Sequence, residues 1–153
     1  MKRVVIAVAA ISLICLATVA RADDVADVKA AEIAFNAAEN AGNIDGMFKL
    51  CLPDRTVYPS AGGPLVEGWT EEGKKRRQAE FDAGRKIDLQ IEDLKARIFG
   101  DTAVTTFYRV GTMKDVGGVT KKVRLRISGV WVRQRSEWKL AHRHESAMSS
   151  EVR

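Results

Sequence analysis

Cysteine is scarce in this chain: there are two among 153 residues, and Cys15 lies within an apolar run at the N-terminus. The remainder of the chain keeps only Cys51, so it cannot form an internal disulfide and must be stabilised by its core. We expect Cys51 to be a small, buried, apolar residue. The chain also lacks a glycine-rich phosphate loop, a CxxC pair and a serine nucleophile elbow, which argues against the chemistries that use them.

The N-terminus has the pattern of a secretory signal. Lys2 and Arg3 precede an uncharged, mostly apolar stretch over 4–20, and Ala20-Arg21-Ala22 fits the small-x-small cleavage rule. We predict a signal peptide over 1–22, a domain over 23–148, a tail over 149–153 and a periplasmic or secreted location. The alternative is an uncleaved membrane anchor, but the apolar stretch falls just short of the ~18 to 20 residues that a spanning helix needs. After cleavage we expect no membrane association.

The charge balance argues against a nucleic-acid partner. Cleavage removes Lys2, Arg3 and Arg21, so the 25 basic residues fall to 22 against 20 acidic ones. A basic run over 74–77 stands beside acidic residues on the same expected helix, which is typical of a solvated helix face.

Hydrophobic spacing predicts helices first and strands afterwards. A helix capped by Asp23 or Asp24 runs to Gly42, a short one after Asn43 carries Cys51, and Thr70 caps a third. A short strand is expected over 56–58, and long strands over 85–98, 103–113, 119–133 and 138–146. This order predicts an α+β fold, with helices packed on one face of a curved antiparallel sheet.

Two changes of phase in the strand pattern predict β-bulges. In one strand the apolar set shifts after Glu92-Asp93, and in another it shifts around Ser128-Gly129. Bulges bend strands, so we expect a curved sheet with a cavity between it and the helices. A cavity of this kind is the usual site for a small organic ligand.

Several short motifs occur in a familiar order. Ala41-Gly42-Asn43 is followed by Leu65-Val66-Glu67-Gly68, Gly100-Asp101 and a W-x6-W-x3-H-x-H-x-S frame that starts at Trp131 and ends at Ser146. This arrangement resembles the SnoaL-like domains of the nuclear transport factor 2-like superfamily, and the association domain of calcium/calmodulin-dependent protein kinase II. The resemblance implies a cone-shaped, cystatin-like fold and self-association through the sheet, as a homodimer or larger.

The resemblance also implies a ligand pocket lined by arginines. One of these maps onto Arg109, whereas the positions of two others hold Gly129 and Glu145. The second change reverses a charge, so we expect neutral or hydroxylated ligands to be preferred over dicarboxylates. The residues that we predict to contact the ligand are Tyr58, Trp69, Arg109, Trp131, Arg143 and Glu145. For the aromatic residues, the alternative is packing in the hydrophobic core.

Glu145 is the candidate catalytic residue, because a carboxylate in a cavity can have a raised pKa and act as a general base. An ion pair with Arg109 or Arg143 is the alternative role. Strand alternation leaves open which set of side chains on the last strand points into the cavity.

The last strand also supplies a predicted interface: Trp138, Leu140, His142, His144 and Ser146. His142 and His144 could begin a metal site, but zinc needs a third protein ligand, so a hydrogen-bonded pair is favoured and no metal or cofactor is expected. The function predicted from all of this is a self-associating domain that binds a small organic ligand. The alternatives are an isomerase, dehydratase or hydrolase that uses Glu145 or a histidine, and a pure assembly module.

Overall fold

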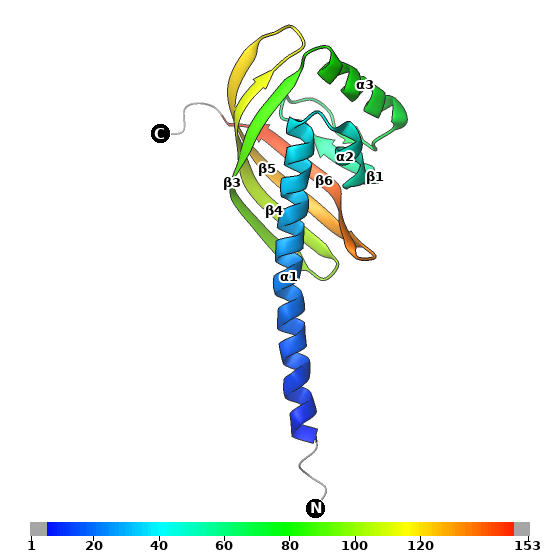
Figure 1. Cartoon of the computed structure of the whole chain (residues 1–153), viewed down its shortest axis with the longest axis vertical. Helices are drawn as coiled ribbons and strands as arrows, with labels where there is room; N and C mark the ends of the chain where they lie inside the picture. The colour runs from blue at the N-terminus through cyan, green and yellow to red at the C-terminus, as the bar shows by residue number, and fades with distance from the viewer. Residues whose placement is uncertain (1–5, 149–153) are drawn as a thin grey trace, which may run out of the picture.

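The computed structural model describes the backbone of residues 6–148 and the side chains of residues 23–148 (Figure 1). The side chains of the predicted signal peptide and the predicted tail over 149–153 lie outside the described residues. The elements are α1 (Ile6–Asn40), α2 (Ile44–Lys49), β1 (Cys51–Tyr58), β2 (Val66–Glu67), α3 (Glu71–Asp82), β3 (Lys86–Phe99), β4 (Thr102–Lys114), β5 (Thr120–Gln134) and β6 (Glu137–Ala147).

Six strands form one curved sheet in the order β2-β1-β6-β5-β4-β3. The C-terminal part of α1 lies across one face of this sheet, and α2 and α3 lie near β1 (Figure 1). The predicted α+β arrangement is therefore confirmed. The sheet is mixed rather than purely antiparallel, because β1 runs parallel to β6 while all other neighbouring strands are antiparallel.

Two predicted helix boundaries are wrong. In the whole chain α1 continues through Ala20-Arg21-Ala22, so neither Asp23 nor Asp24 caps it; Asp24 instead pairs with Arg133 at 2.5 Å. Cys51 belongs to β1, where it pairs with Leu140. The register of β1 against β6 shifts between Cys51 and Thr56, and this irregular segment accommodates Pro53, which has no N–H to donate to the ladder.

The predicted bulge in β3 is confirmed. The pairing of β3 with β4 shifts between Glu92 and Lys95, and the backbone φ of Asp93 is 55°. The second bulge is not in β5 as predicted, because Leu125, Ile127, Gly129 and Trp131 are all buried in unbroken alternation.

The irregularity lies instead on β6, next to the segment of β5 where it was expected. Leu140 and His142 face the consecutive residues Trp131 and Val130 of β5, so Ala141 is an extra residue. Before the bulge Trp138 and Leu140 point into the core; after it Arg143 points inward, and His142 and His144 share the outer face. The prediction of Trp138 and Leu140 at an interface is therefore wrong, since they are 5% and 0% exposed within one chain.

The main core joins the helices to the middle of the sheet. Its buried members are Val28, Phe35, Ile44, Met47, Cys51, Trp69, Ala103, Trp131, Trp138 and Leu140. The prediction of a buried Cys51 is confirmed: the residue is 8% exposed, and burial raises the pKa of its thiol to about 11. Within the described residues, no helix is long and apolar enough to cross a membrane.

Gly129 is required by close packing on the inner face of β5. A Cβ at this position would lie 2.6 Å from Thr105 Oγ1 and 3.2 Å from Glu32 Oε2, both buried. We therefore predict that Gly129→Ala lowers the free energy of unfolding by about 1 to 3 kcal/mol, the usual cost of overpacking. Urea denaturation measures this, with Gly73→Ala in α3 as the control. The control should be neutral or slightly stabilising, since alanine favours a helix, and equal stability of the two variants would contradict the prediction.

Candidate functional site

Three polar side chains of α1 are buried in the middle of its core-facing surface. Glu32, Asn36 and Glu39 are 0%, 9% and 6% exposed. Their spacing places them on the same helix face as Val28 and Phe35. Because buried polar groups must find partners, these three residues determine where the polar groups of the sheet lie.

Glu32 joins α1 to three strands. Its carboxylate accepts hydrogen bonds from Arg143 of β6, from the Thr105 hydroxyl of β4 at 2.9 Å and from the Trp131 indole of β5 at 2.9 Å. The Arg143 guanidinium also stacks on Phe35, with its central carbon 4.2 Å from the ring centroid. Glu32 thus holds Arg143 on the inner face of the sheet.

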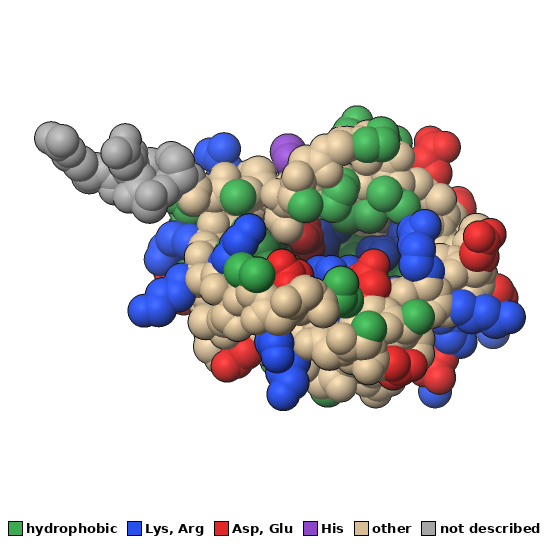
Figure 2. All heavy atoms as spheres, turned by 90° about the horizontal axis from the view of Figure 1, so that it is seen from above, with side chains coloured by type: hydrophobic (Ala, Val, Ile, Leu, Met, Phe, Trp, Pro, Cys, Tyr) green, Lys and Arg blue, Asp and Glu red, His purple; other side chains and the backbone are tan. Residues whose placement is uncertain are grey.

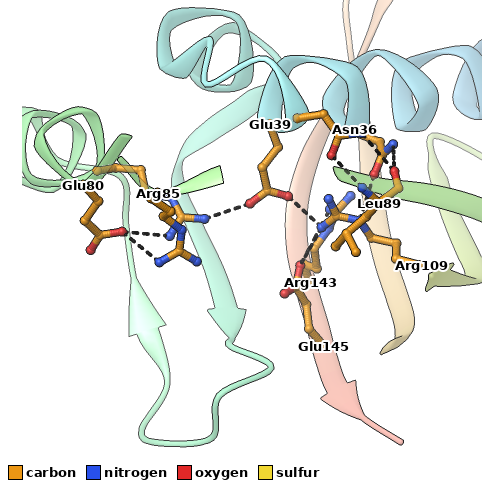
Figure 3. A network of polar contacts seen from close by, with 10 residues as sticks. Asn36, Glu39, Glu80, Arg85, Leu89, Arg109, Arg143 and Glu145 are labelled. Atoms are coloured by element: carbon orange, nitrogen blue, oxygen red, sulfur yellow. Dashed lines mark hydrogen bonds and ion pairs between the residues drawn. The ribbon is translucent and has the colours of Figure 1, made fainter. Parts of the chain in front are cut away.

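A second ion-pair network starts from Glu39, one helical turn after Phe35 (Figure 3). One of its oxygens lies 2.6 Å from Arg109 Nη1 of β4 and the other 2.8 Å from Arg77 Nη2 of α3. Asn36 accepts a hydrogen bond from Arg109 Nε at 2.8 Å and donates to the Leu89 carbonyl. Burial by itself raises the pKa of Glu39, but the guanidinium groups of Arg109, Arg77 and Arg143 outweigh it and hold the pKa well below its ordinary value.

A cavity of about 380 Å³ opens above this network. Viewed down α1 from the α3 end, it is a hollow with basic and acidic side chains inside and apolar ones around it (Figure 2). Four arginines and five glutamates line it: Arg55, Arg76, Arg77, Arg143, Glu39, Glu67, Glu72, Glu80 and Glu145. Helix α3 forms one wall and begins where Thr70 accepts a hydrogen bond from the Gly73 N–H at 3.1 Å.

Glu145 lines this cavity, and its side chain is 16% exposed. Its Oε1 lies 3.8 Å from Arg143 Nη1 and 3.9 Å from Arg109 Nη1, too far for hydrogen bonds. Burial raises the pKa of Glu145, and the charge of Glu39 raises it further, while the two arginines offset part of the effect. The site therefore contains one carboxylate that binds protons weakly and one that binds them strongly.

The residues predicted to contact a ligand are divided by the structure. Trp69, Arg143 and Glu145 line the cavity. Arg109 and Trp131 do not line it: they lie beneath it, 2% and 0% exposed, and are engaged by α1. Tyr58 is also absent from the lining, because it stands opposite His144 in the parallel pairing and shares its outer face.

On the outer face, Tyr58 packs edge-on against both histidines. Its ring centroid lies 6.1 Å from that of His142 and 5.7 Å from that of His144. His142 Nδ1 is 2.7 Å from the Thr56 hydroxyl. No group of three or more metal-ligating side chains was found in the described part of the chain. His142 is thus hydrogen-bonded, as expected of a member of the pair, and His144 contacts the Tyr58 ring.

Sequence reasoning missed four residues of the site: Glu32, Glu39, Arg55 and Arg77. The glutamates carried a signal, because they fall inside the apolar stripe of α1 rather than on its opposite face. Nothing in the local sequence distinguishes Arg55, and Arg77 stands in a basic run that was assigned to solvent.

A family model for the SnoaL-like domain matches residues 28–150, which is most of the chain. The chain belongs to the SnoaL-like domain family. None of the curated proteins matches it significantly in sequence.

Solved structures share the fold of this SnoaL-like domain. A ketosteroid isomerase-like protein from Erwinia carotovora atroseptica superposes with a TM-score of 0.69 at 20% identity, over 82% of this chain and 97% of that one. An NTF2-like protein of unknown function in nutrient uptake from Rhodospirillum rubrum has a TM-score of 0.67 at 23% identity, over 80% and 99%. The CaMKII hub of S. rosetta has a TM-score of 0.66 at 26% identity, over 81% and 96%. The predicted cone-shaped, cystatin-like fold is confirmed.

The raised pKa of Glu145 makes stability depend on pH. Because the folded state holds this proton more tightly than the unfolded chain, ionising Glu145 disfavours folding as the pH rises above about 4.5. We predict that Glu145→Gln, which cannot ionise, gains stability relative to wild type between about pH 5 and about pH 7.5. Urea denaturation at both pH values measures this. The exposed Glu67→Gln should show no such gain, and a difference between Glu145→Gln and wild type that does not change with pH would contradict the assignment.

Proposed function

We propose that this chain is an exported, self-associating domain that binds a small organic molecule in the cavity between α1, α3 and the sheet. The supporting observation is that the guanidinium groups around the cavity are incompletely bonded. Arg109 Nη2, Arg143 Nε and Arg143 Nη1 are buried without a hydrogen-bond partner. Such groups cost free energy unless water or a ligand completes them. Export rests on the signal-peptide pattern over 1–22.

The charges of the cavity favour a ligand that is neutral or hydroxylated over a dicarboxylate. Arg77 and Arg143 are already paired with Glu39 and Glu32. A second anionic group on the ligand would meet Glu39 or Glu145 in a partly desolvated site, where like charges repel strongly.

A thermal-shift screen of neutral, hydroxylated and dicarboxylate compounds tests this preference on wild type and on Glu145→Arg. We predict that wild type responds to neutral or hydroxylated compounds, and that Glu145→Arg moves the preference toward dicarboxylates. Charge reversal at a desolvated position shifts discrimination by about 1 to 3 kcal/mol. Asp82→Arg, at the exposed C-terminal end of α3 and outside the cavity lining, is the control for added charge. A wild-type preference for dicarboxylates that Glu145→Arg leaves unchanged would remove Glu145 from the site.

Proton abstraction by Glu145 is the second candidate function. The observation that favours it is a carboxylate in a cavity, with a raised pKa and no hydrogen bond from a described residue. A general base of this kind could serve an isomerase or a dehydratase. A pure assembly module is the third candidate, and a cavity that binds no compound in the screen would favour it.

Self-association is proposed through the outer face of the sheet, around Tyr58, His142, His144 and Ser146. Trp138 and Leu140 take no part in this proposal because they are buried. The support comes from the likeness to a protein described as a hub and from the aromatic and imidazole groups on this face.

We predict at least twice the chain mass by light scattering at micromolar concentration. Ser128→Arg should shift the protein toward monomer, because the exposed Ser128 pairs with His144 in the middle of this face. Val119→Arg, in the exposed β4–β5 hairpin, should leave the mass unchanged. A wild-type monomer would contradict the proposal.

A further inference from the structure

Arg55 is held at the cavity wall by the loop between β2 and α3. The Gly68 N–H donates to the Arg55 carbonyl at 2.8 Å, and the Trp69 N–H donates to the Pro53 carbonyl at 2.8 Å. Gly68 makes this turn with a φ of 70°, in the left-handed region that suits glycine. The turn brings the Trp69 ring beneath Arg55, whose guanidinium carbon lies 3.9 Å from the ring centroid. The guanidinium is therefore fixed in place from one side.

Among the lining arginines that the structure describes, Arg55 is the partly buried one without an acidic partner. Arg77 and Arg143 are paired with glutamates, and Arg76 is exposed to solvent. No described carboxylate forms an ion pair with Arg55, and its buried Nε has no hydrogen-bond partner. Burial lowers the pKa of Arg55, but a guanidinium stays charged at neutral pH. An uncompensated positive charge thus lies at the cavity wall.

Apolar side chains lie near this charge in the same cavity. Phe35, Met47 and Val57 contribute to the lining, together with the indole of Trp69. A planar guanidinium matches a carboxylate through two parallel hydrogen bonds. The remaining surface suits an apolar group rather than a second negative charge, since Glu145 lines the same cavity at 3.8 Å or more from its nearest cations.

We propose that Arg55 is the anion-binding residue of the cavity, and that the ligand is a small apolar monocarboxylate. This inference rests on the proposed small-molecule function and changes the ligand class in one respect: a single carboxylate is preferred to a neutral or hydroxylated group, while a dicarboxylate stays disfavoured. The carboxylate accepts hydrogen bonds from the terminal amino groups of Arg55, and the apolar body lies against Phe35, Met47 and Val57. Among the described lining arginines that are at least partly buried, only Arg55 lacks an ion-pair partner, which explains why one negative charge is accepted and a second is disfavoured.

Isothermal titration of the full-length domain with benzoate, benzyl alcohol and phthalate tests the inference. Benzoate carries one carboxylate on an apolar ring, benzyl alcohol carries none, and phthalate carries two. We expect benzoate to bind wild type more tightly than either of the others. Arg55→Gln should weaken benzoate at least tenfold, consistent with the loss of a charge-assisted pair, and should leave benzyl alcohol nearly unchanged.

The matched control is Arg97→Gln, which removes an exposed arginine of β3 outside the cavity lining and should leave benzoate binding unchanged. Arg55→Lys keeps the positive charge but loses the two parallel N–H donors of the guanidinium, so we expect an intermediate affinity for benzoate. This variant also tests the proposal if Arg55→Gln fails to fold. Benzoate affinity that is unaltered in either Arg55 variant, or no higher in wild type than that of benzyl alcohol, overturns the role of Arg55. Binding of benzyl alcohol alone would still leave the proposed small-molecule function standing.

Discussion

The buried carboxylate of Glu32 is the contact on which the rest of this domain depends. It receives Arg143, Thr105 and Trp131 from three different strands, so it fixes the distance and rotation of α1 relative to the sheet. A buried charge pair adds little net stability compared with an apolar core, but loss of one partner leaves an expensive unpaired ion. The pair therefore excludes other ways of docking the helix more than it strengthens this one.

The polarity beneath the cavity follows from that constraint. Because Arg143 is bonded to Glu32 and Arg109 to Glu39, the inner face of the sheet is polar at these positions, where a core would be apolar. Glu145 stands two residues beyond Arg143 on the same face and is left with only distant cations. The polarity of the site is thus a by-product of how the helix is anchored, and chemistry at Glu145 would use charges that folding already requires.

The sequence predicted the order of the elements other than β2, the α+β class and the bulge at Asp93, because each depends on local spacing. The network around Glu39 could not be predicted in the same way, since its partners come from β4 and α3, far apart along the chain. Alternation also failed along the last strand. A spacing of two residues connects Trp138, Leu140, His142 and His144, so the sequence places all four on one face. Only the pairing with β5 reveals that Ala141 interrupts this alternation. Gly129 was recognised as a missing arginine, but the reason, the closeness of Thr105 and Glu32, is visible only in three dimensions.

The extra residue Ala141 inverts the alternation of inward and outward side chains along β6. Before Ala141 the even-numbered side chains, such as Leu140, point into the core. After it the odd-numbered side chains, such as Glu145, point inward to the cavity, and the even-numbered ones point to the outer surface. Loss of Ala141 would remove the bulge and the offset together, so every side chain would keep its face. Loss of a residue farther along the strand would keep the bulge and exchange cavity for surface from that point on. A deletion in β6 is therefore tolerable at Ala141, whereas after Ala141 the strand can change only by substitution.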